Sequence, residues 1–266
     1  MIIKFDLTSD VGLKRTNNED IILFNGEFYR DDAACTTLAL NEKAKMAAVV
    51  ADGMGGHAGG EFASELAVQS FQTLVETIPD DVDADMLTDI LKSWVTDAHF
   101  LIQQKGNEMP EYFNMGTTLV GLLFFNGHVL WVNVGDSRIY RFRDGVLRQL
   151  STDHSMRELN NDPTLPSNII YNALGVGDTV FIDVADITGR ILPGDKFLIC
   201  SDGLCDMADD DTIERILCEG GDSAALVEVA KQGGGKDNIS VLIVEIQEYG
   251  TAISTTGETT GEATAE

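Results

Sequence analysis

The chain has 266 residues, with 44 acidic and 18 basic side chains, a formal net charge of −26 and 44% hydrophobic residues. This apolar content is enough for a large folded domain and excludes an acid-rich disordered chain. The negative charge argues against nucleic acid or a membrane surface as a partner and favours cations. Because apolar stretches are short and the N-terminus lacks a signal-peptide pattern, we expect a cytoplasmic protein without a membrane span.

The predicted elements are mostly short strands with two long helices. Short apolar runs predict strands, and apolar recurrence every three or four residues predicts helices. In chain order we expect strands at 5–8, 21–24 and 46–51, helices at 61–78 and 85–104, strands at 118–125, 129–134, 139–143 and 196–200, helices after Asp211 and after Asp222, and a last strand at 239–246.

Hairpins dominate this order of elements. Asn126-Gly127 and Asp144-Gly145 have the residue types of two-residue hairpin turns and lie between pairs of strands. The pattern therefore predicts an α+β fold with largely antiparallel sheets and helices packed outside them. From Tyr249 onward the chain has low complexity and no basic residue, so we expect one domain over 1–248 and a disordered tail over 249–266.

Several other features are interpreted as structural. The acidic clusters at 80–85 and 209–211 stand where helices begin, where caps and the helix dipole favour acids over a separate calcium site. The four cysteines lack a zinc or redox spacing, so they are predicted to be small buried side chains. The glycine-rich runs at 53–58 and 233–236 lack the flanking elements that a Rossmann fingerprint and a P-loop require.

Acidic residues at the ends of strands carry the strongest functional signal. Asp52, Asp136 and Asp202 each follow an apolar run, while Glu19-Asp20 and Asp237 each precede one. In antiparallel sheets the start of one strand lies beside the end of its neighbour, so these acids can converge on one rim. Carboxylates crowded against an apolar core need a counter-charge. Since Mn²⁺ and Mg²⁺ prefer carboxylate and carbonyl oxygens, the sequence predicts a divalent metal site.

Eight motifs, five of which contain these acids, occur in one order along the chain. They are Arg15-Thr-Asn-Asn-Glu19-Asp20, Ala51-Asp52-Gly-Met-Gly-Gly-His57-Ala-Gly-Gly-Glu61, Gly116-Thr-Thr118, Val134-Gly-Asp136-Ser-Arg138, Thr152-Asp-His-Ser155, Leu174-Gly175, Cys200-Ser-Asp202-Gly203 and Asp237-Asn238-Ile-Ser240. With these motifs in this order, the sequence resembles PP2C-type (PPM) metal-dependent protein serine/threonine phosphatases of the compact bacterial form, over about 5–246.

The resemblance implies a four-layer α-β-β-α sandwich and a centre with two Mn²⁺ or Mg²⁺ ions. Asp52 would bridge the ions. By the same resemblance, one ion would be held by Asp202 and Asp237, the other by Glu19 and the carbonyl of Gly53, and a third, weaker ion by Asp136 with Asp202; Asp20 would orient the metal-bound waters. Two such ions would activate a water as the hydroxide that attacks phosphorus.

The resemblance also implies roles around the substrate. Arg15 would clamp the phosphate, with a structural salt bridge as its alternative, and His57 would donate a proton to the leaving group. His99 and His128 are interpreted as structural or surface residues, and His154 belongs to a stretch that precedes a flap. The flap segment, 156–171, is short and lacks the usual basic, histidine-containing sequence, which leaves substrate choice open.

The function that follows is hydrolysis of phosphoserine and phosphothreonine in proteins, opposing a bacterial Ser/Thr kinase, by a monomer. The alternative is a regulatory or binding module that keeps the fold with little activity. Its signature would be loss of Asp52, Asp202 or Asp237, and all three are present. A cation buffer is excluded because no EF-hand-like acidic loop occurs.

Overall fold

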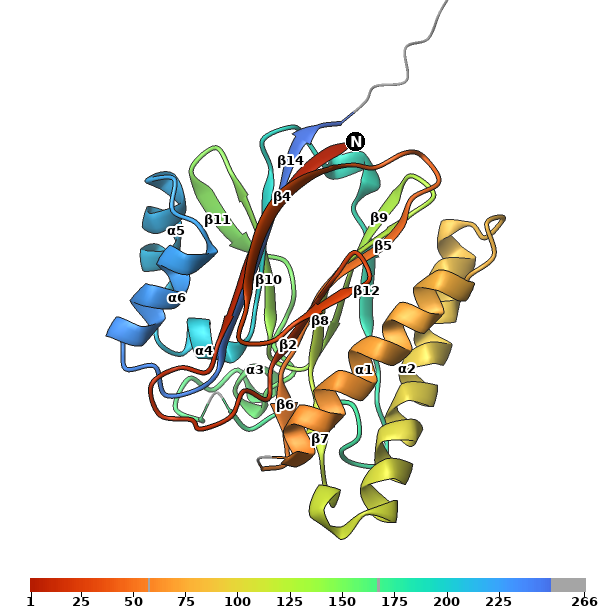
Figure 1. Cartoon of the computed structure of the whole chain (residues 1–266), viewed down its shortest axis with the longest axis vertical. Coiled ribbons are helices and arrows are strands. Elements are labelled where there is room, and N and C mark those ends of the chain that lie inside the picture. The colour runs from red at the N-terminus through yellow and green to blue at the C-terminus, as the bar shows by residue number, and fades with distance from the viewer. Residues whose placement is uncertain (57, 167, 250–266) are drawn as a thin grey trace, which may run out of the picture.

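Two antiparallel sheets form the centre of the molecule (Figure 1). The computed structural model describes residues 1–249 except 57 and 167. The first sheet has the order β11 (Val146–Gln149), β10 (Arg138–Arg143), β13 (Lys196–Cys200), β14 (Ile239–Glu248), β1 (Ile2–Asp10) and β4 (Ala33–Ala39). The second has the order β12 (Asp183–Asp186), β9 (His128–Val134), β8 (Leu119–Phe125), β5 (Lys45–Ala51), β2 (Ile21–Phe24) and β3 (Glu27–Tyr29). A small pair, β6 (Gly53–Met54) and β7 (Gly116–Thr117), continues beyond them.

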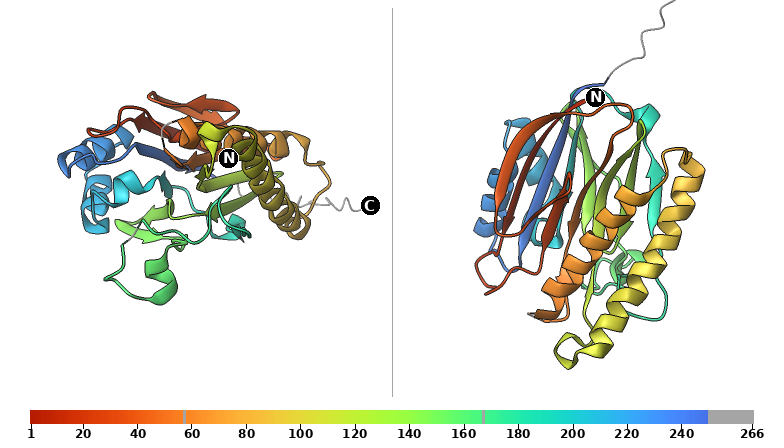
Figure 2. Two further views of the ribbon diagram at one scale, coloured as in Figure 1. Left: turned by 90° about the horizontal axis from the view of Figure 1, so that it is seen from below. Right: turned by 45° about the vertical axis from the view of Figure 1, so that its right-hand side comes forward.

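Helices cover the outer face of each sheet. α1 (Ala58–Thr77) and α2 (Ala84–Glu108) lie side by side over the second sheet, as Figure 2 shows, and α5 (Asp210–Cys218) and α6 (Ser223–Gln232) lie over the first. The short helices are α3 (Met156–Asn160), α4 (Asp202–Cys205) and the 3-10 turns η1 (Pro110–Tyr112) and η2 (Thr188–Arg190). The α-β-β-α sandwich expected from the sequence is confirmed. None of the described helices is long and apolar enough to cross a membrane.

The central strand β5 shows why the sequence makes four layers. Its side chains alternate between the two sheet faces, because successive Cβ atoms of a strand point to opposite sides. Val49 packs in the cluster under α1 and α2, while Ala48 and Val50 pack in the cluster between the two sheets. All three are fully buried. A strand that is apolar on both faces must be covered on both faces. The helices α1 and α2 cover one face of β5, and the first sheet covers the other.

Acidic residues cap the helices as the sequence predicts. The side chain of Asp83 accepts a hydrogen bond from the backbone N–H of Met86 at the start of α2. Asp209 does the same for Thr212 at the start of α5. A carboxylate at this position satisfies a free N–H group and complements the helix dipole. The capping interpretation of both acidic clusters is confirmed.

Two cysteines differ from the sequence-based prediction. Cys200 is buried, but Cys35 and Cys218 are exposed. Cys35 lies on β4, which is at the edge of its sheet and has no buried residue. Cys218 is the last residue of α5. Cysteines are usually buried because the side chain is small and apolar. Cys35 and Cys218 are exposed because they lie on an edge strand and at the end of a helix.

The predicted domain boundary falls at the end of the last strand. Tyr249, the first residue of the expected tail, still donates a hydrogen bond from its hydroxyl to the carbonyl of Thr188. Residues 250–266 lie outside the described part of the chain. The predicted disorder of that segment stays a prediction.

Candidate metal centre

One cavity of about 240 Å³ gathers most of the predicted site residues at the end of the sandwich where α4, β6 and β7 lie (Figure 1). It forms where β5 and β13 end and where β2 and β14 begin, as the antiparallel pairing requires. The predicted residues that line it are Arg15, Glu19, Asp52, Gly53, Asp136, Asp202 and Asp237. The other lining residues, to which the sequence analysis gave no role at the site, are Met54, Gly55, Gly56, Thr118, Asn168 and Ile170.

Asp20 lies behind this cavity rather than on its wall. It is 1% exposed, and its Oδ2 atom has no hydrogen-bond partner among the described residues. Burial raises the pKa of Asp20 to about 7; hydrogen bonds with Ser201 and Ser240 oppose the shift, and the nearby Asp202 adds to it. An indirect role through water suits this position. His57 lies outside the described residues, so its role stays a prediction.

The hydroxyl groups of Thr117 and Thr118 hold the main chain of Asp52 by hydrogen bonds. Its N–H donates to the Thr118 hydroxyl over 3.1 Å, and its carbonyl accepts from the Thr117 hydroxyl over 2.9 Å. Thr118 is held in turn by a 2.8 Å hydrogen bond with the Ser137 hydroxyl. With its backbone held in this way, the Asp52 side chain keeps a defined position at the cavity. The Gly-Thr-Thr motif thus acts by positioning.

Two glycines allow the acidic segments to approach each other. A Cβ atom on Gly53 would lie 2.6 Å from the carbonyl oxygen of Glu19, and one on Gly203 would lie 1.9 Å from that of Asn238. Real Cβ atoms do not make such contacts, so only glycine fits. Gly53 therefore brings the segment after Asp52 against Glu19, and Gly203 brings α4 against the start of β14.

Asn238 is a positioning residue that the sequence analysis quoted without a role. Its side-chain oxygen accepts a 2.9 Å hydrogen bond from the backbone N–H of Glu19. Its amide group donates to the carbonyls of Val11 and Asn17. One buried side chain therefore joins the segment of Glu19 to the segment of Asp237. The available signal was an asparagine, which both donates and accepts, directly after an acidic residue at a strand start.

The cavity is electrostatically unfavourable without a bound cation. Burial first, then repulsion from Asp20 and Asp202, raises the pKa of Asp52 well above its usual value. Burial is also the main cause that raises the pKa of Asp202 to about 6 and that of Asp136 to about 8. Carboxylates that share a low-dielectric site cannot all ionise unless a positive charge joins them.

Arg15 supplies part of that charge. Its Nη2 atom lies 2.7 Å from Oδ2 of Asp237, and the side chains of the two residues are 48% and 37% exposed. The salt bridge given above as the alternative to a phosphate clamp is thus present in this structure. Among the described residues that line the cavity, Arg15 is the sole cation. One guanidinium at the rim offsets only part of the negative charge of the five acidic residues that line the cavity.

The donor set fits a hard divalent cation. It combines carboxylates with a backbone carbonyl, and it lies beside the unpaired oxygen of Asp20. Within the described residues, no three His, Cys, Asp or Glu side chains form a ready-made cage for a metal ion. Mg²⁺ and ions like it commonly keep several waters, so a few direct ligands around a polar cavity are sufficient.

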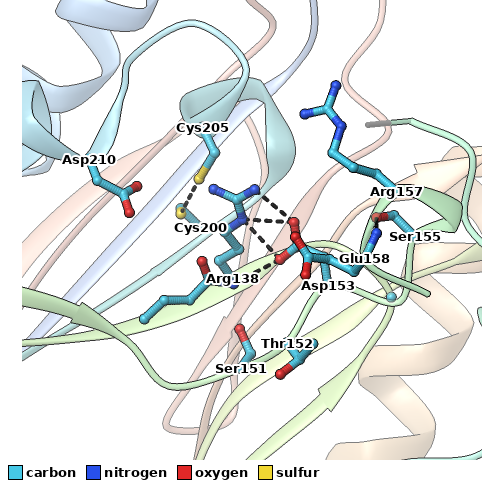
Figure 3. A network of polar contacts seen from close by, with 12 residues as sticks. Arg138, Ser151, Thr152, Asp153, Ser155, Arg157, Glu158, Cys200, Cys205 and Asp210 are labelled. Atoms are coloured by element: carbon cyan, nitrogen blue, oxygen red, sulfur yellow. Dashed lines mark hydrogen bonds and ion pairs between the residues drawn. The ribbon is translucent and has the colours of Figure 1, made fainter. Parts of the chain in front are cut away.

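Two further motifs are joined beside the cavity. The Arg138 guanidinium donates hydrogen bonds to both carboxylate oxygens of Asp153, with distances of 2.7 to 3.0 Å. Figure 3 shows the two side chains facing each other. His154 is buried, and its Nδ1 atom accepts a 3.0 Å hydrogen bond from the backbone N–H of Gly135. These contacts hold the turn that carries Asp136. The Thr-Asp-His-Ser stretch therefore supports the Asp136 turn, a role that the sequence analysis did not assign to it.

The other two histidines are structural, as expected. His99 is 1% exposed in α2, and its Nδ1 atom accepts from the N–H of Gly175. His128 lies at the start of β9, half-buried, beside Asp186. Neither residue lines the cavity.

Comparison with known families gives a match over most of the domain. The model of the family described as protein phosphatase 2C matches residues 24–230. The chain belongs to this family. That membership agrees with the fold and with the order of the acidic motifs along the chain.

Individual members of the protein phosphatase 2C family are similar over nearly the whole chain. The serine/threonine protein phosphatase PstP of Mycobacterium tuberculosis is 33% identical over 94% of this chain, which spans 46% of PstP. The serine/threonine phosphatase stp of Listeria monocytogenes is 32% identical over 90% of this chain and 94% of its own length. The catalytic domain of PstP in complex with two manganese ions superposes with a TM-score of 0.72 at 30% identity, covering 93% of this chain and 100% of that one.

We predict that this phosphatase 2C domain, free of metal, loses stability as the pH rises. The raised pKa values of Asp20, Asp136 and Asp202 mean that these groups stabilise the fold fully below the ordinary carboxyl pKa of about 4. That stability is lost as the pH rises through 6 to 8. We expect the melting temperature in chelator to fall by roughly 4–8 °C between pH 5 and pH 8, which corresponds to on the order of 2 kcal/mol.

The same melting experiment with Mn²⁺ is the control. Saturating Mn²⁺ at pH 8 should restore the melting temperature, because the ion stabilises the ionised carboxylates. A melting temperature in chelator that stays constant or rises over this range would contradict the prediction.

Proposed function

We propose that the chain is a Mn²⁺- or Mg²⁺-dependent phosphatase that hydrolyses phosphoserine and phosphothreonine in proteins. The observation that carries the proposal is the cavity in which acids from five separate segments meet, where burial and then repulsion between carboxylates raise the pKa values of Asp52, Asp136 and Asp202. Family membership and relatives named as serine/threonine phosphatases support it. The two manganese ions bound to the PstP catalytic domain support the choice of metal.

The proposed ligand roles follow the position of each acid. Asp52, whose pKa is raised by burial and then by four neighbouring aspartates, would be the ligand shared by two ions. Asp202 and Asp237 would hold one ion, and Glu19 with the Gly53 carbonyl would hold the other. Asp136 and Asp202 would together hold a third ion. When bound, such ions lower the pKa of water and supply a nucleophile near neutral pH.

Arg15 has two possible partners in this proposal. In the structure it pairs with Asp237, and about half of its side chain is exposed. If Asp237 served as a metal ligand, Arg15 would lose this partner and its guanidinium would be available to bind two oxygens of a phosphate. His57 is proposed as the proton donor to the serine or threonine oxygen that leaves.

The function is tested by phosphopeptide and p-nitrophenyl phosphate turnover. We expect activity with Mn²⁺, none with chelator, and a loss of about a hundredfold or more in Asp202→Asn, because removal of a ligand forfeits several kcal/mol of metal-derived stabilisation. Activity that persists in chelator, or an unaffected Asp202→Asn protein, would overturn the proposed chemistry.

A second prediction separates the roles of Arg15. We expect Arg15→Ala to raise KM for phosphopeptides about tenfold while Mn²⁺ affinity stays equal or increases, because the variant removes a competitor for Asp237. Steady-state kinetics and calorimetric Mn²⁺ titration measure the two effects. Arg148→Ala, on the outlying strand β11, is the matched control. A collapse of Mn²⁺ affinity in Arg15→Ala would assign Arg15 to the scaffold.

The regulatory-module alternative makes the opposite prediction, which is Mn²⁺ binding without turnover of any phosphoester. No observation on the described residues favours it. The link to a bacterial Ser/Thr kinase, the monomeric state, Mg²⁺ as the metal, the third ion and the cytoplasmic location stay predictions.

A further inference from the structure

Two cysteines flank the proposed ligand Asp202. Cys200 is the last residue of β13 and is fully buried, and Cys205 is the last residue of α4. Their sulfur atoms lie 3.5 Å apart and point toward each other in Figure 3. A disulfide has an S–S distance of about 2.05 Å, so the two atoms need to approach by roughly 1.5 Å more. The geometry is that of two reduced thiols in contact.

Cys205 is the accessible member of the pair. It is half-buried and lines a cavity of about 400 Å³ together with Arg157, Asp202 and Asp237. This cavity shares Asp202 and Asp237 with the candidate metal centre. A small oxidant in the cavity is therefore beside Cys205, whereas Cys200 is fully buried and does not line the cavity.

The surroundings of Cys205 favour its thiolate. A hydrogen bond from Cys200 is the main cause that lowers the pKa of Cys205; burial opposes it, and the charge of Arg138 adds to it. The Tyr140 hydroxyl lies 3.5 Å from the Cys205 sulfur. A partly accessible thiol beside a guanidinium, with a second thiol in contact, is typical of cysteines that react with peroxides.

We propose that Cys200 and Cys205 are a redox modification site, which a hydroperoxide converts to a disulfide that weakens divalent-ion binding through Asp202. The Cys205 sulfur attacks one peroxide oxygen; the O–O bond breaks, Cys205 becomes a sulfenic acid, and the other oxygen leaves as water or an alcohol. The Cys200 sulfur then attacks Cys205, the S–S bond forms, and the sulfenic oxygen leaves as water with the Cys200 proton. Two electrons pass from the thiols to the peroxide, and a dithiol reverses the change.

The disulfide would act on Asp202 because it closes the short segment that carries it. Asp202 opens α4, whose single turn is held by the hydrogen bond from the Asp206 N–H to the Asp202 carbonyl. The approach of the two sulfurs moves the end of this turn toward β13. The backbone of Gly203 lies so close to Asn238 that an added Cβ atom would be 1.9 Å from the Asn238 carbonyl oxygen, so α4 has little free space on that side and its shift would displace Asp202. This step rests on the proposed function, whereas disulfide formation does not.

The chain offers its own controls. Cys35 and Cys218 are exposed and lie away from the cavity, on β4 and at the end of α5. In the C35S/C218S protein, Cys200 and Cys205 remain as the only thiols. Any loss of free thiols in that protein therefore reports on oxidation of Cys200 and Cys205.

The first measurement is the mass of the C35S/C218S protein after treatment with hydrogen peroxide and then iodoacetamide. We expect a product lighter by two hydrogen atoms that takes up no alkyl group, and a peptide map with a bond between Cys200 and Cys205. Dithiothreitol should restore two alkylation sites. Two free thiols after peroxide, under conditions in which Cys35 and Cys218 of the unchanged protein react, would overturn the proposal.

The second measurement is Mn²⁺ binding by calorimetry to the reduced and oxidised C35S/C218S protein. We expect the Kd to rise at least fivefold on oxidation and to return with dithiothreitol. A third variant, C35S/C218S with Cys205→Ser, should keep its Kd under peroxide, and its thermal unfolding shows whether it is folded. An unchanged Kd in a protein with the disulfide present would overturn the coupling to Asp202. If the reduced protein binds no Mn²⁺, the proposed function fails and the coupling fails with it, while the mass measurement still decides the disulfide.

Discussion

Asp52→Asn is expected to lower phosphopeptide turnover by about 10²–10³-fold. Burial and then four surrounding aspartates raise the pKa of Asp52 well above its usual value, so the Asp52 carboxylate is strongly coupled to a bound cation. The amide keeps the shape of the side chain and one neutral oxygen but loses the charge. Loss of several kcal/mol of metal-derived stabilisation corresponds to this range of rates. The measurement is kcat/KM for a phosphothreonine peptide at saturating Mn²⁺.

The same substitution should raise the stability of the metal-free protein at pH 8. The amide side chain would carry no charge to be repelled by Asp20 and Asp202, so the melting temperature in chelator should increase while the stabilisation by Mn²⁺ decreases. Asp97→Asn, at an exposed position on α2, is the matched control and should change neither quantity. If Asp52→Asn kept full turnover, or lost stability in chelator to the same degree as in Mn²⁺, Asp52 would be a structural residue and the metal proposal would be wrong.

The strands and the acidic rim could be predicted together because the acids stand directly before or after the apolar runs that mark the strands. Buried strands such as β5 and β8 are apolar on both faces, so they stand out as continuous runs. The acids that end or precede such runs are brought to one rim by antiparallel pairing alone. Asp52 and Asp202 could therefore be placed in one cavity without knowledge of any tertiary contact.

Edge elements and long-range contacts could not be predicted in the same way. β4 has no buried residue, and its backbone pairing with β1 decides its structure rather than its sequence pattern. The salt bridge between Arg15 and Asp237 joins residues far apart in the sequence, and spacing gives no sign of it. The contact between Cys200 and Cys205 was also missed, because a one-turn helix between two cysteines is not a recognised thiol motif.

The role of glycine at the rim could be predicted only in part. A glycine after an aspartate predicts a turn, but the sequence does not reveal what the backbone approaches there. At Gly203 the structure supplies the answer, which is the carbonyl of Asn238. This contact makes Gly203 a test of whether the close approach of α4 and β14 is what assembles the centre.

We expect Gly203→Ala to destabilise the protein and to abolish most Mn²⁺ binding. The added Cβ atom would lie 1.9 Å from the Asn238 carbonyl oxygen, so α4 and the start of β14 must separate. Overpacking of this kind costs about 2–3 kcal/mol, or a fall in melting temperature of roughly 5–10 °C. The separation would also move Asp202 away from Asp237, so Mn²⁺ affinity should fall at least tenfold.

Gly189→Ala is the matched control, because a Cβ atom at that exposed position meets no atom within 4 Å. Its melting temperature and Mn²⁺ affinity should stay close to those of the unchanged protein. The two effects of Gly203→Ala have one cause in this account, so they should appear together in thermal unfolding and calorimetry. Gly203→Ala could instead lose stability and still bind Mn²⁺ with unchanged affinity. Mn²⁺ binding would then not depend on the short distance between Asp202 and Asp237, which would contradict the proposal that the two residues hold one ion.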